Sequence, residues 1–256
     1  MEVVIIIVTV LFLFILLPII LYYLGHPILW LLYIILLIQF LPTLLFHHEI
    51  LCRIRPYITH KFGKYDYFRS ATSDILQRHF KVFVSGPEYY SSPVIFIVNH
   101  HEPGSYLDHF CLMKIKTRAK IVMYQRSGLV EKLFRNIEHI ALPKHTGNRL
   151  PLFLEKCKQE IDQGTSIIIY PEGKYASLKS TPFPLQNFQT GAFVLACTYG
   201  IPIVPLLISG GNYKNGWVTY KPIKMKYLPL IDPKGFSPEN LRDHCLKLMN
   251  LEAKYL

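Results

Sequence analysis

The hydrophobic residues of this chain are concentrated at its amino end. Two apolar runs, 3–24 and 28–46, are separated by a three-residue break that begins at Gly25, and the first 46 residues contain one charged side chain, Glu2. Each run is about as long as a helix needs to cross ~30 Å of hydrocarbon. The pattern therefore predicts a helical membrane hairpin over residues 1–48, either spanning the bilayer twice or entering one leaflet and returning.

Basic and histidine side chains follow the second run immediately: His47, His48, Arg53, Arg55, Lys61, Lys64 and Arg69. Because positive charge collects on the cytoplasmic side of a membrane segment, the domain that follows is expected on that side. A cleaved signal peptide is not favoured, since the first run lacks a basic start and a small-residue cleavage site.

The remaining residues, 49–256, alternate between strand-like and helix-like segments. The apolar, β-branched runs are typical of strands buried on both faces, and the 3.6-residue periodicity elsewhere is typical of helices. Strands are expected at 93–98, 166–170 and 203–208, and helices at 150–164 and 191–199. This alternation predicts an α/β domain with a mostly parallel sheet flanked by helices.

Two polar clusters directly follow expected strands. Asn99 and His100 come after the first strand, and Pro171-Glu172-Gly173 follows the second. Because ligands collect at the carboxyl ends of strands in such sheets, the clusters are expected to converge on one site.

The first cluster contains a possible base and its orienting carboxylate. A carboxylate that fixes the tautomer of a histidine allows the imidazole to accept a proton, and the candidates are His100, His101, Glu102, Asp108 and His109. In the second cluster, Glu172 can contact a substrate hydroxyl, and Lys174 can bind phosphate as a point charge. Taken alone, each cluster is equally typical of a polar surface loop.

Five motifs in order reduce that ambiguity. They are Asn99-His100 with Asp108, Pro171-Glu172-Gly173, the Phe-x-x-Gly-Ala-Phe segment at 188–193, the Ile-Pro-Ile-Val-Pro segment at 201–205, and the basic strand at 222–229. Together, over roughly residues 80 to 250, they resemble the PlsC-type glycerolipid acyltransferases, which include the 1-acylglycerol-3-phosphate acyltransferases.

The resemblance implies a reaction and its catalytic residues. His100 is expected to be the general base and Asp108 its orienter, so that the acceptor hydroxyl attacks the acyl-CoA thioester directly, without an acyl-enzyme. Acyl-CoA is then a co-substrate, and no cofactor or metal is expected. The reaction class is lysophospholipid acylation in phospholipid biosynthesis or remodelling.

The resemblance also implies an acceptor site. Glu172 and Gly173 are expected to shape it, Lys174 and Lys144 to bind phosphate, and Ile201, Pro202 and Pro205 to support the pocket. The family has an arginine after Pro-Glu-Gly-Thr, whereas positions 174 and 175 are Lys and Tyr. Lysine lacks the bidentate fork of arginine, so a neutral mono- or diacylglycerol acceptor remains an alternative.

The spacing within the first motif departs from the family. Seven residues separate His100 from Asp108, where the family has four, and the turn-forming pair Pro103-Gly104 lies among them. His100 can still meet Asp108 if the extra residues bulge outward. The alternatives are that His101 is the base, or that the pair is broken and the protein is a catalytically silent lipid-binding membrane module.

Composition narrows the possible partners. The net charge of +11 fits anionic lipid or phosphorylated substrates, and the positive charges lack the aromatic interleaving of a nucleic-acid-binding motif. Five scattered cysteines without a CxxC pair argue against zinc and disulfide frameworks. No Gly-x-Ser-x-Gly segment is present, which disfavours a serine hydrolase. Membrane lipids, the bilayer and acyl-CoA are therefore the expected partners.

Overall fold

The structure is a computed structural model in which the described residues form two compact units, Met1–His48 and Glu49–Leu256. Each unit is described by itself. The described residues are 16–23, 25, 29, 31, 33–35, 77, 81–87, 93–100, 111–112, 114–124, 139–143, 149–173, 183–185, 187–210, 213–214, 217–218 and 222–256.

The amino-terminal unit contains one helix with described bounds, α2 (Leu17–Tyr23), which lies within the first apolar run. Large apolar side chains along it are solvent-exposed, among them Ile19 and Tyr23. Among the residues that the structure describes, no helix combines the length and the apolar character needed to cross a membrane. Most of the predicted hairpin over residues 1–48 lies outside the described residues, and it stays a prediction.

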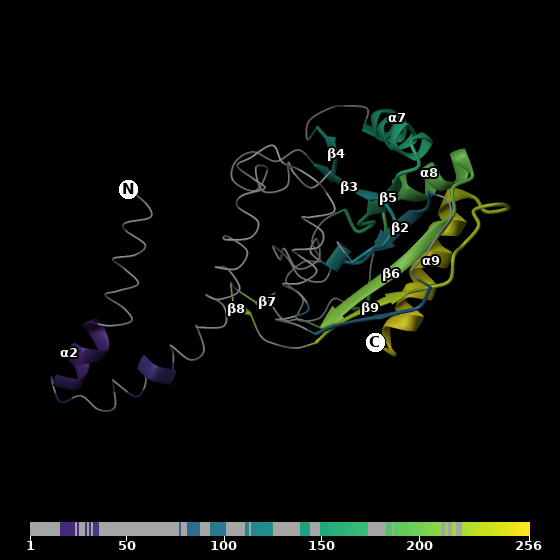
Figure 1. Cartoon of the computed structure of the whole chain (residues 1–256). Helices are drawn as coiled ribbons and strands as arrows, with labels where there is room; N and C mark the ends of the chain where they lie inside the picture. The colour runs from purple at the N-terminus through teal and green to yellow at the C-terminus, as the bar shows by residue number, and fades with distance from the viewer. Residues whose placement is uncertain are drawn as a thin grey trace. The chain divides into compact units, whose positions relative to one another are not determined.

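A seven-stranded sheet forms the centre of the described part of the second unit (Figure 1). Its strands lie in the order β1-β9-β6-β2-β5-β3-β4. Their bounds are β1 Val82–Ser85, β2 Ile95–Val98, β3 Ala119–Tyr124, β4 His139–Leu142, β5 Ser166–Ile169, β6 Ile203–Gly210 and β9 Ile223–Tyr227. A separate two-stranded ladder pairs β7 (Tyr213–Lys214) with β8 (Trp217–Val218).

Most of the sheet is parallel. The strands β6, β2, β5, β3 and β4 pair with one another in parallel, whereas β9 runs antiparallel to β6 and β1 runs parallel to β9. Every residue of β2 and β5 is buried. The prediction of an α/β domain with a mostly parallel sheet is confirmed.

Three described helices pack beside the sheet, α7 (Arg149–Asp162), α8 (Gly191–Tyr199) and α9 (Pro238–Ala253) (Figure 1). Their apolar side chains share one core with alternate residues of the central strands, such as Ile95, Ile97 and Ile167. The helices predicted at 150–164 and 191–199 are thereby confirmed, with α7 starting at Arg149. Helix α9 begins where the Ser237 hydroxyl accepts a hydrogen bond from the Asn240 N–H, as an N-cap does.

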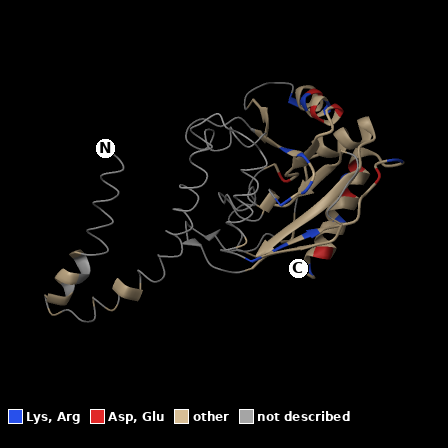
Figure 2. Cartoon of the chain, viewed as in Figure 1, with Lys and Arg blue, Asp and Glu red and all other residues tan. Residues whose placement is uncertain are grey.

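The charged side chains are distributed over several elements, including α7, β9 and α9 (Figure 2). Two lysines on the sheet form ion pairs with helix carboxylates. The Lys120 ammonium lies 2.8 Å from Glu160 on α7, and the Lys226 ammonium lies 2.7 Å from Glu252 on α9. Each pair ties a strand to the helix that covers it.

Gly210, at the end of β6, is required by a close backbone approach. Its φ is +81°, and a Cβ atom there would lie 1.9 Å from the carbonyl oxygen of Pro222. An L-residue side chain therefore meets both an unfavourable backbone conformation and a collision with backbone atoms that cannot move independently. The turn from β6 towards β9 depends on this glycine.

We expect Gly210→Ala to lower the free energy of unfolding by more than about 2 kcal/mol, as measured by urea denaturation in detergent. The matched control is Gly164→Ala, because Gly164 has a similar φ of +77° but nothing within 4 Å of the added Cβ. The control should lose only about 1–2 kcal/mol of unfolding free energy, because its alanine meets the unfavourable backbone conformation but no collision. Equal losses for the two variants would contradict the role of the close approach.

Candidate active site

Asn99 is the first residue after β2, and its side chain joins β2 to β6. The residue is fully buried. Its Nδ2 donates to the Ile208 carbonyl oxygen at 3.0 Å, and its Oδ1 accepts from the Ile208 N–H at 2.8 Å. The backbone register of the two strands ends at Val98 opposite Leu206, so the Asn99 amide replaces a peptide group and extends the ladder by one step. The residue that follows Asn99 is thereby held at the carboxyl edge of the sheet.

That residue, His100, is held from the neighbouring strand as well. Its backbone N–H donates to the Glu172 carboxylate, with 3.1 Å between the nitrogen and Oε1. Ile97 on β2 lies in register with Ile169 on β5, so the residues that follow the two strands lie beside each other. The predicted convergence of the two polar clusters is therefore present for His100 and Glu172.

The imidazole ring of His100 lies flat against the ring of Tyr170. The two ring centroids are 3.9 Å apart, and the interplanar angle is 6°. His100 and Tyr170 each expose only about 9% of their surface. A nearly buried histidine that is fixed in both backbone and ring is suited to proton transfer with a substrate that reaches it.

Backbone hydrogen bonds hold the turn that carries Tyr170 and Glu172. The Gly173 N–H donates to the Tyr170 carbonyl oxygen at 3.2 Å, and the Gln189 N–H donates to the Pro171 carbonyl oxygen at 2.7 Å. Gly173 has a φ of +63°, and a Cβ there would lie 3.1 Å from the Gln189 side chain. The segment before α8 thus fixes the turn after β5, which explains why this motif and the Phe-x-x-Gly-Ala-Phe segment occur together.

The described residues include only some of the predicted site. His101, Asp108, Lys144 and Lys174 lie outside the described residues, so their roles as alternative base, orienter and phosphate ligands stay predictions. Glu172 contacts the backbone of His100, and Gly173 follows it in the turn after β5. The role of Glu172 and Gly173 in shaping the acceptor site stays a prediction.

The predicted pocket residues Ile201 and Pro202 lie just before β6, and Pro205 lies within it. Pro205 is buried within β6 in register with Ile97, and the Ile95 N–H donates to the Pro202 carbonyl oxygen at the amino ends of the strands. The structure therefore does not bring Ile201 and Pro202 to the edge where His100 lies. The contacts of these residues support the β2–β6 pair.

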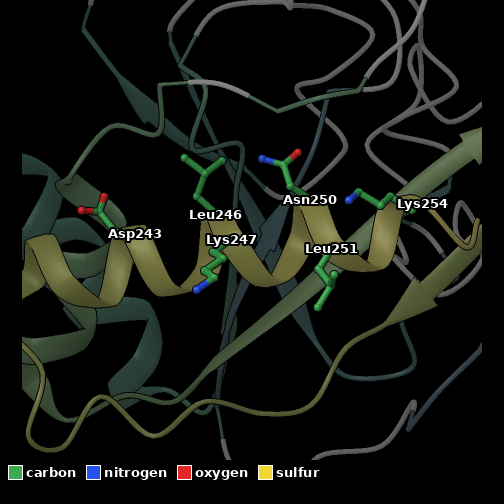
Figure 3. Close-up of a pocket in the computed structure, with 6 residues that line it drawn as sticks. All are labelled: Asp243, Leu246, Lys247, Asn250, Leu251 and Lys254. Atoms are coloured by element: carbon green, nitrogen blue, oxygen red, sulfur yellow. The ribbon is translucent and has the colours of Figure 1, made fainter.

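A groove of about 480 Å³ runs along α9, and neither Tyr170 nor Glu172 lines it (Figure 3). All of its lining residues belong to that one helix: Asp243, Leu246, Lys247, Asn250, Leu251 and Lys254. Their side chains are spread along the helix and do not converge on a point (Figure 3). The groove therefore shows no grouping of side chains around a reacting centre.

Two of the described cysteines on the helices, Cys157 and Cys245, do not offer an activated nucleophile either. Burial raises the pKa of the Cys157 thiol and of the Cys245 thiol to about 12. Both are therefore protonated at neutral pH, whereas the thiolate is the reactive form. Of the described side chains, His100 is the one whose setting fits acid–base chemistry best.

Two contacts of the site were not anticipated from the sequence. One is the stack of Tyr170 on His100, and the other is the pairing of Asn99 with β6. A signal for the second exists, because an amide that directly follows four buried apolar residues must find hydrogen-bond partners in the protein. No comparable signal exists for the stack, which depends on the register of β2 against β5.

A family model described as Acyltransferase matches residues 81–209, slightly more than half of the chain. Among curated proteins, a probable 1-acyl-sn-glycerol-3-phosphate acyltransferase of Mycoplasma pneumoniae is 28% identical over 51% of this chain and 50% of its own length. The 1-acyl-sn-glycerol-3-phosphate acyltransferase of Haemophilus influenzae is 33% identical over 34% of this chain and 37% of its own length. The matches span half or less of these relatives.

The crystal structure of the 1-acyl-sn-glycerophosphate (LPA) acyltransferase PlsC from Thermotoga maritima has a similar fold. Its TM-score is 0.64 at 19% sequence identity, covering 85% of this chain and 95% of that chain. The matched family range contains Asn99, His100, Tyr170 and Glu172. The family predicted from the order of the motifs is confirmed.

We expect Asn99→Leu to lower the free energy of unfolding by about 2–4 kcal/mol, because it leaves the buried N–H and C=O of Ile208 without their partners. Urea denaturation measures the loss. Asn250→Leu is a matched comparison, since the Asn250 amide makes the same two bonds to the Leu185 backbone at 2.7 and 3.1 Å.

Asn99 also precedes His100, so its loss should reduce acyl transfer per folded molecule, at a temperature where both variants are folded. The Asn250 variant provides the baseline for an equal loss of stability. Equal activity in the two variants would contradict a role for Asn99 in positioning the site.

Proposed function

The chain belongs to the Acyltransferase family, and from this premise we propose that it transfers a fatty acyl group from acyl-CoA to the free hydroxyl of a lysophospholipid. The proposed acceptor is similar to lysophosphatidic acid, which is the acceptor class in the names of the relatives. The observation that carries the proposal is His100, nearly buried at the carboxyl edge of the sheet and fixed by Glu172 and Tyr170.

In the proposed reaction, His100 is the general base. Its ring nitrogen takes the proton of the acceptor hydroxyl as the oxygen attacks the thioester carbonyl carbon. The tetrahedral oxyanion then collapses, the carbon–sulfur bond breaks, and the imidazolium returns the proton to the CoA sulfur. Asp108 is proposed to fix the tautomer of His100. No acyl-enzyme and no cofactor besides the co-substrate acyl-CoA are needed.

Glu172 contributes to this scheme through the backbone of His100. A carboxylate that accepts a backbone N–H forms a stronger hydrogen bond than a neutral acceptor does. This contact supports the proposal that the turn after β5 sets the position of the base, while Gly173 leaves space for Gln189. Lys174 and Lys144 are proposed to neutralise the acceptor phosphate.

Membrane attachment belongs to the same proposal. Both the acceptor and the product are membrane lipids, and the apolar runs within residues 1–48 would hold the enzyme at the bilayer. The basic residues that follow support a catalytic domain on the cytoplasmic side, where acyl-CoA is available. The hairpin and the domain together would allow the enzyme to act on lipid that stays in the membrane.

The proposal is tested by measuring CoA release from acyl-CoA with the full chain in detergent. We expect release with lysophosphatidic acid and much less with monoacylglycerol. His100→Ala should reduce the rate at least about 100-fold, because general-base catalysis contributes on that order. His101→Ala and His244→Ala, the latter at an exposed position on α9, should retain activity.

Other outcomes have distinct meanings. Activity with monoacylglycerol in place of lysophosphatidic acid would establish the neutral-acceptor alternative. Loss of activity in His101→Ala with activity retained in His100→Ala would move the base by one residue. Binding of lysolipid without CoA release from any acyl-CoA would contradict the enzymatic proposal and identify a silent lipid-binding module.

A further inference from the structure

Tyr170 has no role in the proposed chemistry, although its ring stacks on the ring of the proposed base. It is the residue that directly follows β5, and its ring is parallel to the His100 ring within 6° at 3.9 Å between centroids. Tyr170 is buried beside the end of β2. A parallel stack at this distance covers one whole face of the imidazole.

We propose that Tyr170 is a positioning residue for His100, which orients the imidazole plane and stabilises the imidazolium that forms during acyl transfer. This inference rests on the proposed function, in which His100 is the base. It assigns a role to the aromatic ring of Tyr170, and it makes no use of the phenolic hydroxyl.

The first part of the argument concerns orientation. The backbone of His100 is held by two neighbours, because its own N–H is bonded to Glu172 and the preceding Asn99 is bonded to β6. With the backbone fixed, the remaining freedom of His100 is rotation about its side-chain bonds. Rotation of the imidazole about the Cβ–Cγ bond would drive a ring edge into the Tyr170 face. The stack therefore fixes the plane in which the ring nitrogens lie.

The second part concerns charge. The face of a phenol ring carries negative electrostatic potential, which attracts a cation placed above it. When His100 takes the proton of the acceptor hydroxyl, the positive charge forms against that face, in a site where little water competes. The interaction is stronger in the transition state than in the ground state, so it contributes to the rate of the chemical step. A change in kcat is therefore expected, with little change in substrate binding.

The size of the effect separates this role from simple packing. Loss of a partly desolvated cation–π contact corresponds to a decrease on the order of tenfold in rate. A Tyr170 that only filled space would be replaced by another large apolar side chain without a specific loss of kcat. Leucine and phenylalanine distinguish these cases, because phenylalanine keeps the aromatic face and leucine does not.

The experiment compares Tyr170→Phe and Tyr170→Leu with the wild-type full chain in detergent, using acyl-CoA and lysophosphatidic acid. We expect Tyr170→Phe to retain kcat within about threefold and Tyr170→Leu to lose about tenfold in kcat. The KM values for both substrates should change by less than about twofold, because the ring contacts the base and not the substrate. Thermal unfolding of each variant reports its folded fraction.

A second readout reports the stack without catalysis. The ring protons of His100 lie over an aromatic face, so their NMR signals should be shifted upfield in protein with isotope-labelled histidine, and His100→Gln identifies them by their absence. The shift should persist in Tyr170→Phe and disappear in Tyr170→Leu. The wild-type measurement alone tests the geometry if the leucine variant does not fold.

Unchanged kcat in a folded Tyr170→Leu variant, a rise in KM at constant kcat, or His100 signals without an upfield shift would each overturn the inference. Failure of the proposed function gives a different pattern. The wild-type protein would then release no CoA with any acceptor. The upfield shift of the His100 signals would still test whether Tyr170 stacks on His100.

Discussion

The parallel pairing of β2 with β5 is the interaction on which the rest of the site depends. Ile97 lies opposite Ile169, so the chain leaves both strands at the same level of the sheet, and His100 meets Tyr170 and Glu172 there. A slip of one residue would turn every side chain of the strand to the opposite face and separate the histidine from both partners. The shapes of the buried side chains hold this register, because the slipped arrangement would put Phe96 into the core where Ile95 and Ile97 pack.

Around this pair, the polar groups of the site satisfy one another's hydrogen-bonding needs. An apolar side chain in place of Asn99 would leave the N–H and C=O of Ile208 on β6 unpaired. Glu172 accepts from the backbone N–H of His100, which lies beyond the end of β2. Buried polar groups without partners are costly, so these contacts make the residues that follow β2 and β5 part of the stable sheet. Rigidity at His100 is thus obtained with the same interactions that hold the strands together.

The sequence was sufficient for the class of fold, because the buried strands are short aliphatic runs and the helices end at recognisable residues such as Gly164 and Gly200. The sequence did not predict β1 and β4, because these partly exposed four-residue strands carry little periodic signal. Helix α9 was not among the predicted elements either. Within the site, Glu172 could be placed near His100 because both follow strands. The stack of Tyr170 on His100 could not be predicted. It depends on how β2 and β5 are aligned, and no local sequence pattern reveals that alignment.

The separation of the contacting residues along the chain has a consequence for how the protein matures. His100 is 72 positions from Glu172, and Asn99 is 109 positions from Ile208, so the site has no precursor in any short segment. Contacts between such distant positions form only after the intervening chain has been ordered, and they carry a high entropic cost until then. During synthesis, the amino-terminal apolar runs emerge from the ribosome long before β6. A chain that engages a membrane through the predicted hairpin therefore does so while His100, the proposed base, still lacks its contacts with Glu172 and Tyr170.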